Sequence, residues 1–314
     1  MAELVVGANL PWIRYGQDFG ANAWQPRGGV ARPACRERAR RALLDLADSG
    51  AALVRWWLLG DGRAGLREDG GRILGLDDRF FADVDAAVES VRESGLRVQL
   101  VLTDFLWLDA PRLVGGVRLG GRREHVRDPH LRARLLERVF APIAERYGRE
   151  PVIAGWDLMN APEWATLAVG TLDPRRSVSR RQMRSYLAEV ASLFRARATQ
   201  PLTVGLASSR WLRLVEGFDL DEVQLHWYEA LDPVAALAKP VGSLGLGCPV
   251  QLGEFPTRGA SLPPATILQI ARDAGYAKAL AWSALAEDVA TDPRACRLAL
   301  RQWCGRPAPG LRQA

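Results

Sequence analysis

The sequence predicts a (β/α)8 barrel, which is a closed ring of parallel strands surrounded by helices. Short apolar segments alternate with longer amphipathic segments along the chain, as expected for repeated strand–helix units. Eight such units fit into the 314 residues, and eight is the number that this barrel requires. No shift in composition marks a boundary, so we expect residues 1–314 to form a single barrel domain.

A doubly wound open sheet is the alternative α/β architecture. The first apolar segment is followed by neither a GxGxxG nor a GxxxxGK[ST] pattern, the phosphate-binding motifs that often open such sheets. The sequence therefore favours the closed barrel.

Eight apolar runs of strand length supply the expected barrel strands. Their alternation with longer amphipathic segments indicates a parallel sheet. In chain order they are Leu4–Asn9, Ala52–Leu58, Arg97–Thr103, Val152–Asn160, Pro201–Leu206, Val223–Trp227, Pro249–Glu254 and Leu280–Ser283.

Helices are expected between these strands. The clearest amphipathic runs are Ala34–Ser49, Arg79–Ser94 and Ser179–Ala198. A further helix is expected to begin at Asp128-Pro129, because a capping residue followed by proline is a common helix start. Shorter helices are expected near Leu212, Val234, Ile267 and Leu298.

Four long loops are expected to follow strands and to narrow any cleft at that rim. They are Pro11–Pro33, Gly60–Asp78, Asp104–Arg127 and Pro162–Ser177.

The net charge of +6 raises the question of nucleic-acid binding. The basic residues are almost all arginines, and they are interspersed with acidic residues in helical segments such as Arg36–Arg41 and Arg132–Arg138. Binding proteins concentrate such charges in one stripe. Solvated helix faces are therefore the favoured interpretation, and we expect no nucleic-acid partner.

The cysteines and the first residues indicate a cytoplasmic protein. The four cysteines show no CxxC spacing, so reduced thiols are expected. The first ten residues lack the basic region of a signal peptide, and no apolar run reaches the length of a membrane helix. We expect no membrane partner, and a secreted protein is expected only if a leader has been removed. The oligomeric state does not follow from the sequence.

Polar and aromatic residues gather where the expected strands end, which is the rim that carries active sites in this fold. Ten of the eleven tryptophans lie in or just after strands. Indole rings stack on flat, weakly apolar ligands such as the C–H faces of sugars, although tryptophans also fill cores. We expect Trp107, Trp164 and Trp282 to contact a ligand and Trp156, in the middle of a strand, to pack in the core.

Glu254 is the most informative single residue. It ends an apolar strand, where a carboxylate has no packing role, and Gly253 before it permits close approach of backbone or ligand. An exposed glutamate at a strand end is the alternative interpretation.

The order of these motifs resembles clan A glycoside hydrolases, especially glycoside hydrolase family 5. The segment Trp156-Asp-Leu-Met-Asn160-x-Pro162 resembles the fourth-strand motif, in which a hydrophobic strand precedes Asn-Glu-Pro. The segment Gln251-Leu-Gly-Glu254-Phe is similar to the seventh-strand motif. Further partners of the family are matched by Arg55, His226, Tyr228 and Trp282, so the resemblance spans nearly the whole chain in order.

The resemblance implies a retaining β-glycosidase that acts on β-linked oligosaccharides by double displacement, without cofactor or metal. In such enzymes one carboxylate attacks the anomeric carbon and a second carboxyl group protonates the leaving oxygen. Carried over, Glu254 is the nucleophile, kept ionised by Arg55 and hydrogen-bonded by Tyr228.

The resemblance also implies roles for three neighbours of the nucleophile. Asn160 binds the sugar 2-hydroxyl group, His226 orients the acid/base side of the site, and Trp282 forms the floor under the reacting sugar. The substrates implied are β-glucosides or β-mannosides, and we expect small ligands cleaved from a chain end.

The sequence departs from the family at Ala161, where the acid/base glutamate is expected. A methyl group cannot transfer a proton. Three explanations are a deliberate replacement of glutamate, a natural sugar-binding barrel without activity, and substitution by Glu163. The undisturbed remainder of the motifs favours the first. Because Glu163 lies beyond Pro162, we expect its side chain to line the cleft and not to replace the missing acid.

Overall fold

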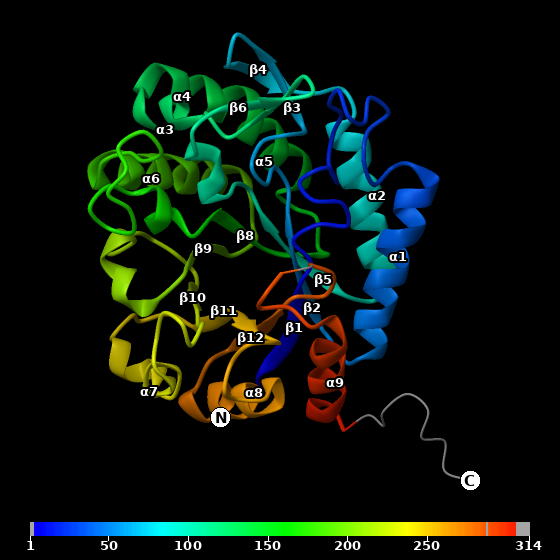
Figure 1. Cartoon of the computed structure of the whole chain (residues 1–314), viewed down its shortest axis with the longest axis vertical. Helices are drawn as coiled ribbons and strands as arrows, with labels where there is room; N and C mark the ends of the chain where they lie inside the picture. Colours follow the sequence, from blue (N-terminus) through cyan, green and yellow to red (C-terminus); the bar gives the residue numbers. More distant parts are fainter. Residues whose placement is uncertain (1–2, 287, 306–314) are drawn as a thin grey trace.

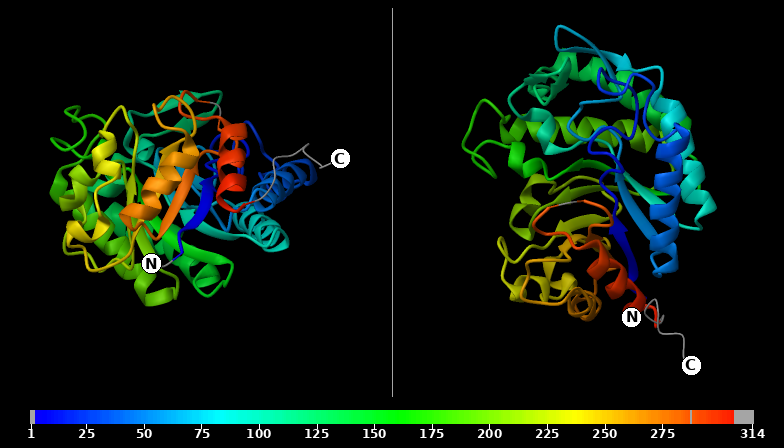
Figure 2. Two further views of the ribbon diagram at one scale, coloured as in Figure 1. Left: turned by 90° about the horizontal axis from the view of Figure 1, so that it is seen from below. Right: turned by 45° about the vertical axis from the view of Figure 1, so that its right-hand side comes forward.

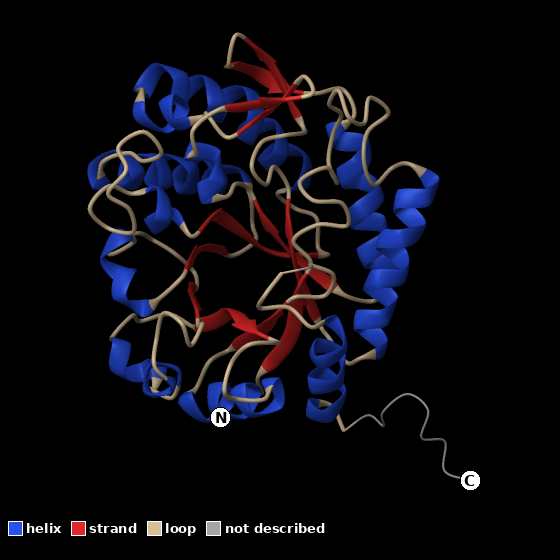
Figure 3. Cartoon of the chain, in the orientation of Figure 1, coloured by secondary structure: helices blue, strands red, loops and turns tan. Residues whose placement is uncertain are grey.

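The computed structural model describes residues 3–286 and 288–305, and its centre is a closed barrel of eight parallel strands. The strands are β1 (Val5–Asn9), β2 (Leu53–Trp57), β5 (Arg97–Val101), β8 (Ile153–Asn160), β9 (Leu202–Leu206), β10 (Val223–His226), β11 (Val250–Pro256) and β12 (Lys278–Trp282). Figure 3 shows these strands in the middle of the molecule, surrounded by helices. The predicted fold class is confirmed, and each barrel strand overlaps an apolar run expected to form it, although β11 ends later and β12 begins earlier than expected.

The barrel closes because β1 pairs with both β2 and β12, so the first and last strands of the chain lie side by side. The two further views of Figure 2 again place the strands at the centre and the helices outside. Parallel pairing brings the carboxyl ends of all eight strands to one rim. Residues far apart in sequence therefore meet there.

Helices cover the outside of the barrel (Figure 1). They are α1 (Pro33–Asp48), α2 (Phe80–Glu93), α3 (Arg123–Arg127), α4 (Pro129–Leu135), α5 (Ala141–Tyr147), α6 (Arg180–Arg197), α7 (Val234–Leu237), α8 (Pro264–Ala274) and α9 (Pro293–Trp303), with a π-helical turn at Leu136–Phe140. The expected start at Asp128 is confirmed, since its side chain accepts hydrogen bonds from the backbone N–H groups of His130 and Leu131. In the described residues, none of these helices combines the length and the apolarity needed to cross a bilayer.

The long loops contain structure that the sequence did not predict. One loop holds the hairpin β3 (Leu66–Asp69) and β4 (Arg72–Leu76), and the next holds β6 (Arg112–Val114) and β7 (Val117–Leu119). Short 3-10 helices occur at Phe105–Leu108, Pro162–Ala165, Ser209–Leu214 and Val241–Leu244. The helix expected near Leu212 is thus a 3-10 helix and not an α-helix.

The barrel interior contains a layer of three buried glutamines. Gln99 donates to Oε1 of Gln224 at 2.6 Å, and Gln251 donates to the side chains of both. Gln224 in turn donates to Asp157 at 2.9 Å. Because buried amides lose water on folding, these mutual hydrogen bonds are what makes a polar layer tolerable there.

Candidate active site

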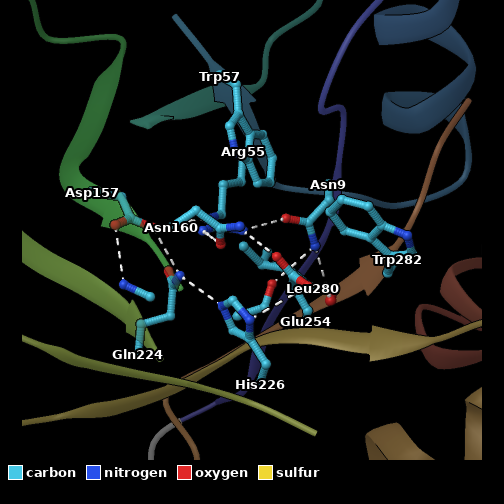
Figure 4. Close-up of polar contacts among 12 residues, drawn as sticks. Asn9, Arg55, Trp57, Asp157, Asn160, Gln224, His226, Glu254, Leu280 and Trp282 are labelled. Carbon is cyan, nitrogen blue, oxygen red and sulfur yellow. Dashed lines mark hydrogen bonds and ion pairs between the residues drawn. The ribbon is translucent and has the colours of Figure 1, made fainter. Parts of the chain in front are cut away.

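Arg55 is the centre of a buried polar cluster at the carboxyl ends of the strands (Figure 4). It lies on β2, and all of its guanidinium N–H groups are engaged. Nε and Nη2 donate to Asp157 at 3.0 and 2.7 Å, and Nη2 also donates to Asn160 at 2.7 Å. Nη1 donates to Asn9 at 3.0 Å and to Glu254 at 2.8 Å. One cation thereby connects four strands of the barrel.

Glu254 receives hydrogen bonds on both carboxylate oxygens. Arg55 approaches Oε1, and the Tyr228 hydroxyl donates to Oε2 at 2.8 Å. The expected contacts of both residues with Glu254 are therefore present. Burial nevertheless raises the Glu254 pKa to about 7, against the lowering effects of Arg55 and Tyr228. Arg55 favours the ionised form as expected, but desolvation is the larger effect.

His226 contacts the same carboxylate, with its Nδ1 lying 3.4 Å from Oε2 of Glu254. Its Nε2 lies 3.2 Å from the amide nitrogen of Gln224, so Nε2 accepts and Nδ1 carries the proton. Burial and the charge of Arg55 hold the His226 pKa well below its usual range, which keeps the ring neutral. The structure thus places His226 against Glu254, and its expected role in orienting the acid/base side of the site stays a prediction.

Asn160 ends strand β8 beside this cluster, and Ala161 follows it. The Asn160 amide oxygen accepts from Arg55 and its nitrogen donates to Asp104 at 2.8 Å. Ala161 is buried and has a left-handed backbone with φ of 49° and ψ of 50°. Its N–H donates to the carbonyl of Gly205 at 2.7 Å. The backbone is thus fixed by β9, and only a methyl group occupies the position where the family places a carboxyl group.

Glu163 does not line a cleft, which corrects the expectation. Its side chain is fully buried, with an exposed fraction of 0%. Oε1 accepts a hydrogen bond from the backbone N–H of Ala207, while Oε2 has no partner among the described residues. Burial, with smaller effects from Glu254 and Asp104, raises the Glu163 pKa to about 8. The group is therefore a neutral acid at pH 7 inside the protein.

The tryptophans divide between the site and the core. Trp282 is half-buried and meets Trp57 edge to face with 5.7 Å between ring centroids, and its indole nitrogen donates to Asp288. Trp164 is also half-buried and packs against Trp211 at 5.0 Å. As expected, Trp156 lies in the core.

Trp107 is buried, with an exposed fraction of 1%, and donates to the carbonyl of Leu59. The expected ligand contact of Trp107 is therefore wrong, because the loop folds it under Arg122.

A pocket of about 450 Å³, including its open mouth, adjoins the cluster. Trp57, Asp104 and Trp282 bound it on the side of Arg55, whose guanidinium lies 4.2 Å from the centre of the Trp57 ring. Trp12 and Tyr15 also line it. Aromatic faces and carboxylates together suit a ligand with C–H surfaces and hydroxyl groups.

Sequence reasoning missed Asn9, Asp104, Asp157 and Gln224 as members of the site. Asp157 carried a usable signal, because a carboxylate within an apolar strand requires a buried cation, and Arg55 lies within another apolar strand. Asn9 ends β1 and donates to the carbonyl of Gly253 at 2.9 Å, so it links β1 to the strand of Glu254. That contact depends on the register of the closed barrel.

No protein-family model matches the chain. The chain is 27% identical over 158 residues to the mannan endo-1,4-beta-mannosidase of Mytilus edulis. This match covers 50% of the chain but only 39% of the mussel protein.

Solved structures match over nearly the whole chain. The endo-1,4-beta-mannanase of Eisenia fetida matches with a TM-score of 0.79 and 19% identity, covering 97% of this chain and 92% of that one. The beta-1,4-mannanase of Aplysia kurodai gives 0.76 and 20%, covering 95% and 92%. A GH5_18 protein of Streptomyces cattleya in complex with Manβ1-4GlcNAc gives 0.68 and 15%, covering 96% and 80%. These structures share the barrel fold that the resemblance to clan A glycoside hydrolases implied.

Proposed function

We propose that this chain is a retaining β-glycosidase of the family 5 type whose acid/base position is occupied by Ala161. The observation that carries the proposal is Glu254, a buried carboxylate bound by Arg55 and Tyr228 at the catalytic rim of the barrel. Glu254 is the proposed nucleophile for the anomeric carbon of a β-linked sugar. Arg55 and Tyr228 favour its ionised form, against the opposing effect of burial.

The remaining site residues have roles in sugar binding under this proposal. Asn160 presents an amide N–H to the 2-hydroxyl group, and Trp282 packs under the ring of the reacting sugar. Trp164 and Trp211 form an aromatic pair after strands β8 and β9, where a second sugar unit is bound. The substrate is a β-mannoside or β-glucoside, and the likeness to β-mannanases in sequence and fold supports the β-mannoside.

Without a carboxyl group at Ala161, the leaving oxygen must depart unprotonated. We therefore expect binding and very slow turnover of natural glycosides. Ala161→Glu is expected to raise hydrolysis of an unactivated β-glycoside by about 10²- to 10⁴-fold, the usual contribution of general acid–base assistance. Initial rates on a panel of β-mannosides and β-glucosides measure this. Failure of every substrate to show the increase contradicts the acid/base assignment.

Ala168→Glu is the matched control. Ala168 is also a left-handed alanine, with φ of 58°, but it is exposed in the following loop. The Ala168→Glu substitution adds the same carboxyl group outside the site, and we expect it to leave the rate of glycoside hydrolysis unchanged. Azide, a nucleophile that needs no general base, is expected to accelerate the unchanged chain on an aryl glycoside with a good leaving group. A β-glycosyl azide is the expected product.

A sugar-binding barrel without catalytic activity is the second candidate, and Ala161 itself favours it. The same substitution separates the two. Recovery of turnover indicates an otherwise intact enzyme, whereas sugar binding without recovered turnover indicates a binding protein.

A further inference from the structure

Asp104 is a buried carboxylate beside the site for which the proposed reaction has no assigned use. It follows strand β5 and has an exposed fraction of 7%, with part of its surface on the pocket. Three N–H groups from three elements point at it. Oδ2 accepts from Asn160 at 2.8 Å and from the Trp57 indole at 3.3 Å, and Oδ1 accepts from the backbone of Leu106 at 3.0 Å.

These contacts fix the orientation of the Asn160 amide. Its oxygen accepts from Arg55 and one N–H of its nitrogen donates to Asp104. A flipped amide would point N–H groups at the guanidinium and its oxygen at the carboxylate, so both contacts would become repulsive. The second N–H of Asn160 has no acceptor among the described residues and remains available to a ligand.

Asp104 also binds Trp57, the aromatic residue of the same cluster. The Trp57 indole that donates to it lies under the Arg55 guanidinium at 4.2 Å. Arg55 in turn donates to Glu254. One carboxylate therefore anchors both the hydrogen-bonding partner and the stacking partner of Arg55.

We propose that Asp104 is a positioning residue for the glycosidase reaction, acting through Asn160. It holds the Asn160 amide so that the free N–H faces the sugar hydroxyl adjacent to the carbon that Glu254 attacks. This inference rests on the proposed function. A hydrogen bond to that hydroxyl strengthens as the transition state forms, so its correct placement affects kcat more than KM.

The test uses Ala161→Glu as the parent enzyme and compares Asp104→Ser with it. Serine retains an oxygen that can cap Leu106 but is too short to reach Asn160 and Trp57. Both enzymes are assayed on an aryl β-mannoside and on its 2-deoxy analogue. On the full substrate we expect kcat/KM to fall about 10- to 100-fold, mainly in kcat, as when an oriented donor is lost. On the 2-deoxy analogue we expect less than about a threefold change, because the contact is already absent.

Asp128→Ser is the matched control. Asp128 caps the first turn of α4 with the same type of contact, far from Asn160 in the chain, and its substitution is expected to leave both substrates unaffected. If Asp104→Ser does not fold, as judged by circular dichroism, Asp104→Asn is measured in the same way. Asparagine keeps the shape of the side chain, but its NH2 group must face one of the N–H donors that bind the Asp104 carboxylate.

Equal losses on both substrates overturn the positioning role, because a purely structural effect does not distinguish them. A parent Ala161→Glu enzyme without turnover overturns the proposed function and this inference with it. The two failures are therefore distinguishable.

Discussion

Glu163 is the residue whose environment differs most from the expectation based on sequence. Because Glu163 is a carboxylate that follows Pro162, its side chain was expected to line the cleft at the rim. The 3-10 turn at Pro162–Ala165 instead directs its carboxyl group to the N–H of Ala207 after β9. That N–H is brought near only by barrel closure, so no local pattern in the sequence could reveal the contact.

The Glu163 environment predicts how stability depends on pH. With a folded pKa of about 8 against an ordinary 4.5, the folded protein keeps a proton that the unfolded chain releases between these values. The free energy of unfolding therefore falls as pH rises from about 4.5 to 8. Glu163→Gln removes this titration, and we expect it to stabilise the protein at pH 8.5 by a few kcal/mol while changing little at pH 5.

Urea unfolding at the two pH values measures this difference. Glu137→Gln, on an exposed position of the π-helical turn, is the control and is expected to show no difference that depends on pH. An equal effect of Glu163→Gln on stability at both pH values would contradict the raised pKa of Glu163.

Other site residues were predictable because their positions follow from strand ends. Arg55, Asn160, Tyr228 and Glu254 meet as expected. Trp107 was not predictable, since its side chain turns inward with a 3-10 helix that Asp104 caps. A position just after a strand predicts that a residue lies near the rim. It does not predict which way the side chain points when the residue is on a long loop.

At the scale of elements, the strands were predictable and the rim hairpins were not. Barrel strands carry long apolar runs, whereas β6 is three residues long and exposed at each of them, so neither length nor alternation marks it. The hairpin loops are held by tertiary contacts. Figure 1 shows β3, β4 and β6 together beside α3 and α4.

Arg122 is the main tether of these rim segments. Its buried guanidinium donates to the carbonyls of Gly120 and Gly62 at 2.6 Å each and to that of Asp61 at 3.3 Å. It also forms a two-point ion pair with Glu68 on β3. The loops after β2 and β5 are thereby joined through one side chain.

We expect Arg122→Ala to loosen both hairpins, because it leaves buried carbonyl groups and Glu68 without partners. Loss of a buried pair costs about 3–5 kcal/mol, and the barrel strands do not depend on it directly. Limited proteolysis is expected to cut within residues 60–78 and 109–122 first. Arg127→Ala, which removes a largely exposed ion pair with Glu124, should leave the cleavage pattern unchanged. Cleavage elsewhere first would contradict the tether.

For the whole molecule, the net charge is +6, but the arginines are spread over the surface and many of them pair with nearby carboxylates. Arginines pair with carboxylates around the surface, as in Arg146 with Asp85 and Arg195 with Asp221. Even the cluster of arginines on α6 is partly engaged, since Arg184 donates to the carbonyls of Arg213 and Glu216.

We therefore expect only weak binding to duplex DNA or to RNA at physiological salt, with a shallow dependence on salt concentration. Release of counterions from a true binding stripe would give a steep decline of affinity with salt. Fluorescence anisotropy with labelled oligonucleotides at several salt concentrations measures this. Submicromolar affinity with a steep salt slope would contradict the balanced surface and favour a nucleic-acid function.

The methyl group of Ala161 lies outside the hydrogen-bonded cluster around Arg55. None of the hydrogen bonds that Arg55 donates in this cluster involves the side chain at position 161. Under the proposed function, we therefore expect a substitution at position 161 to change catalysis far more than it changes the fold. On the same proposal, the choice between alanine and glutamate at this one position separates a sugar-binding protein from a sugar-cleaving enzyme on the same barrel.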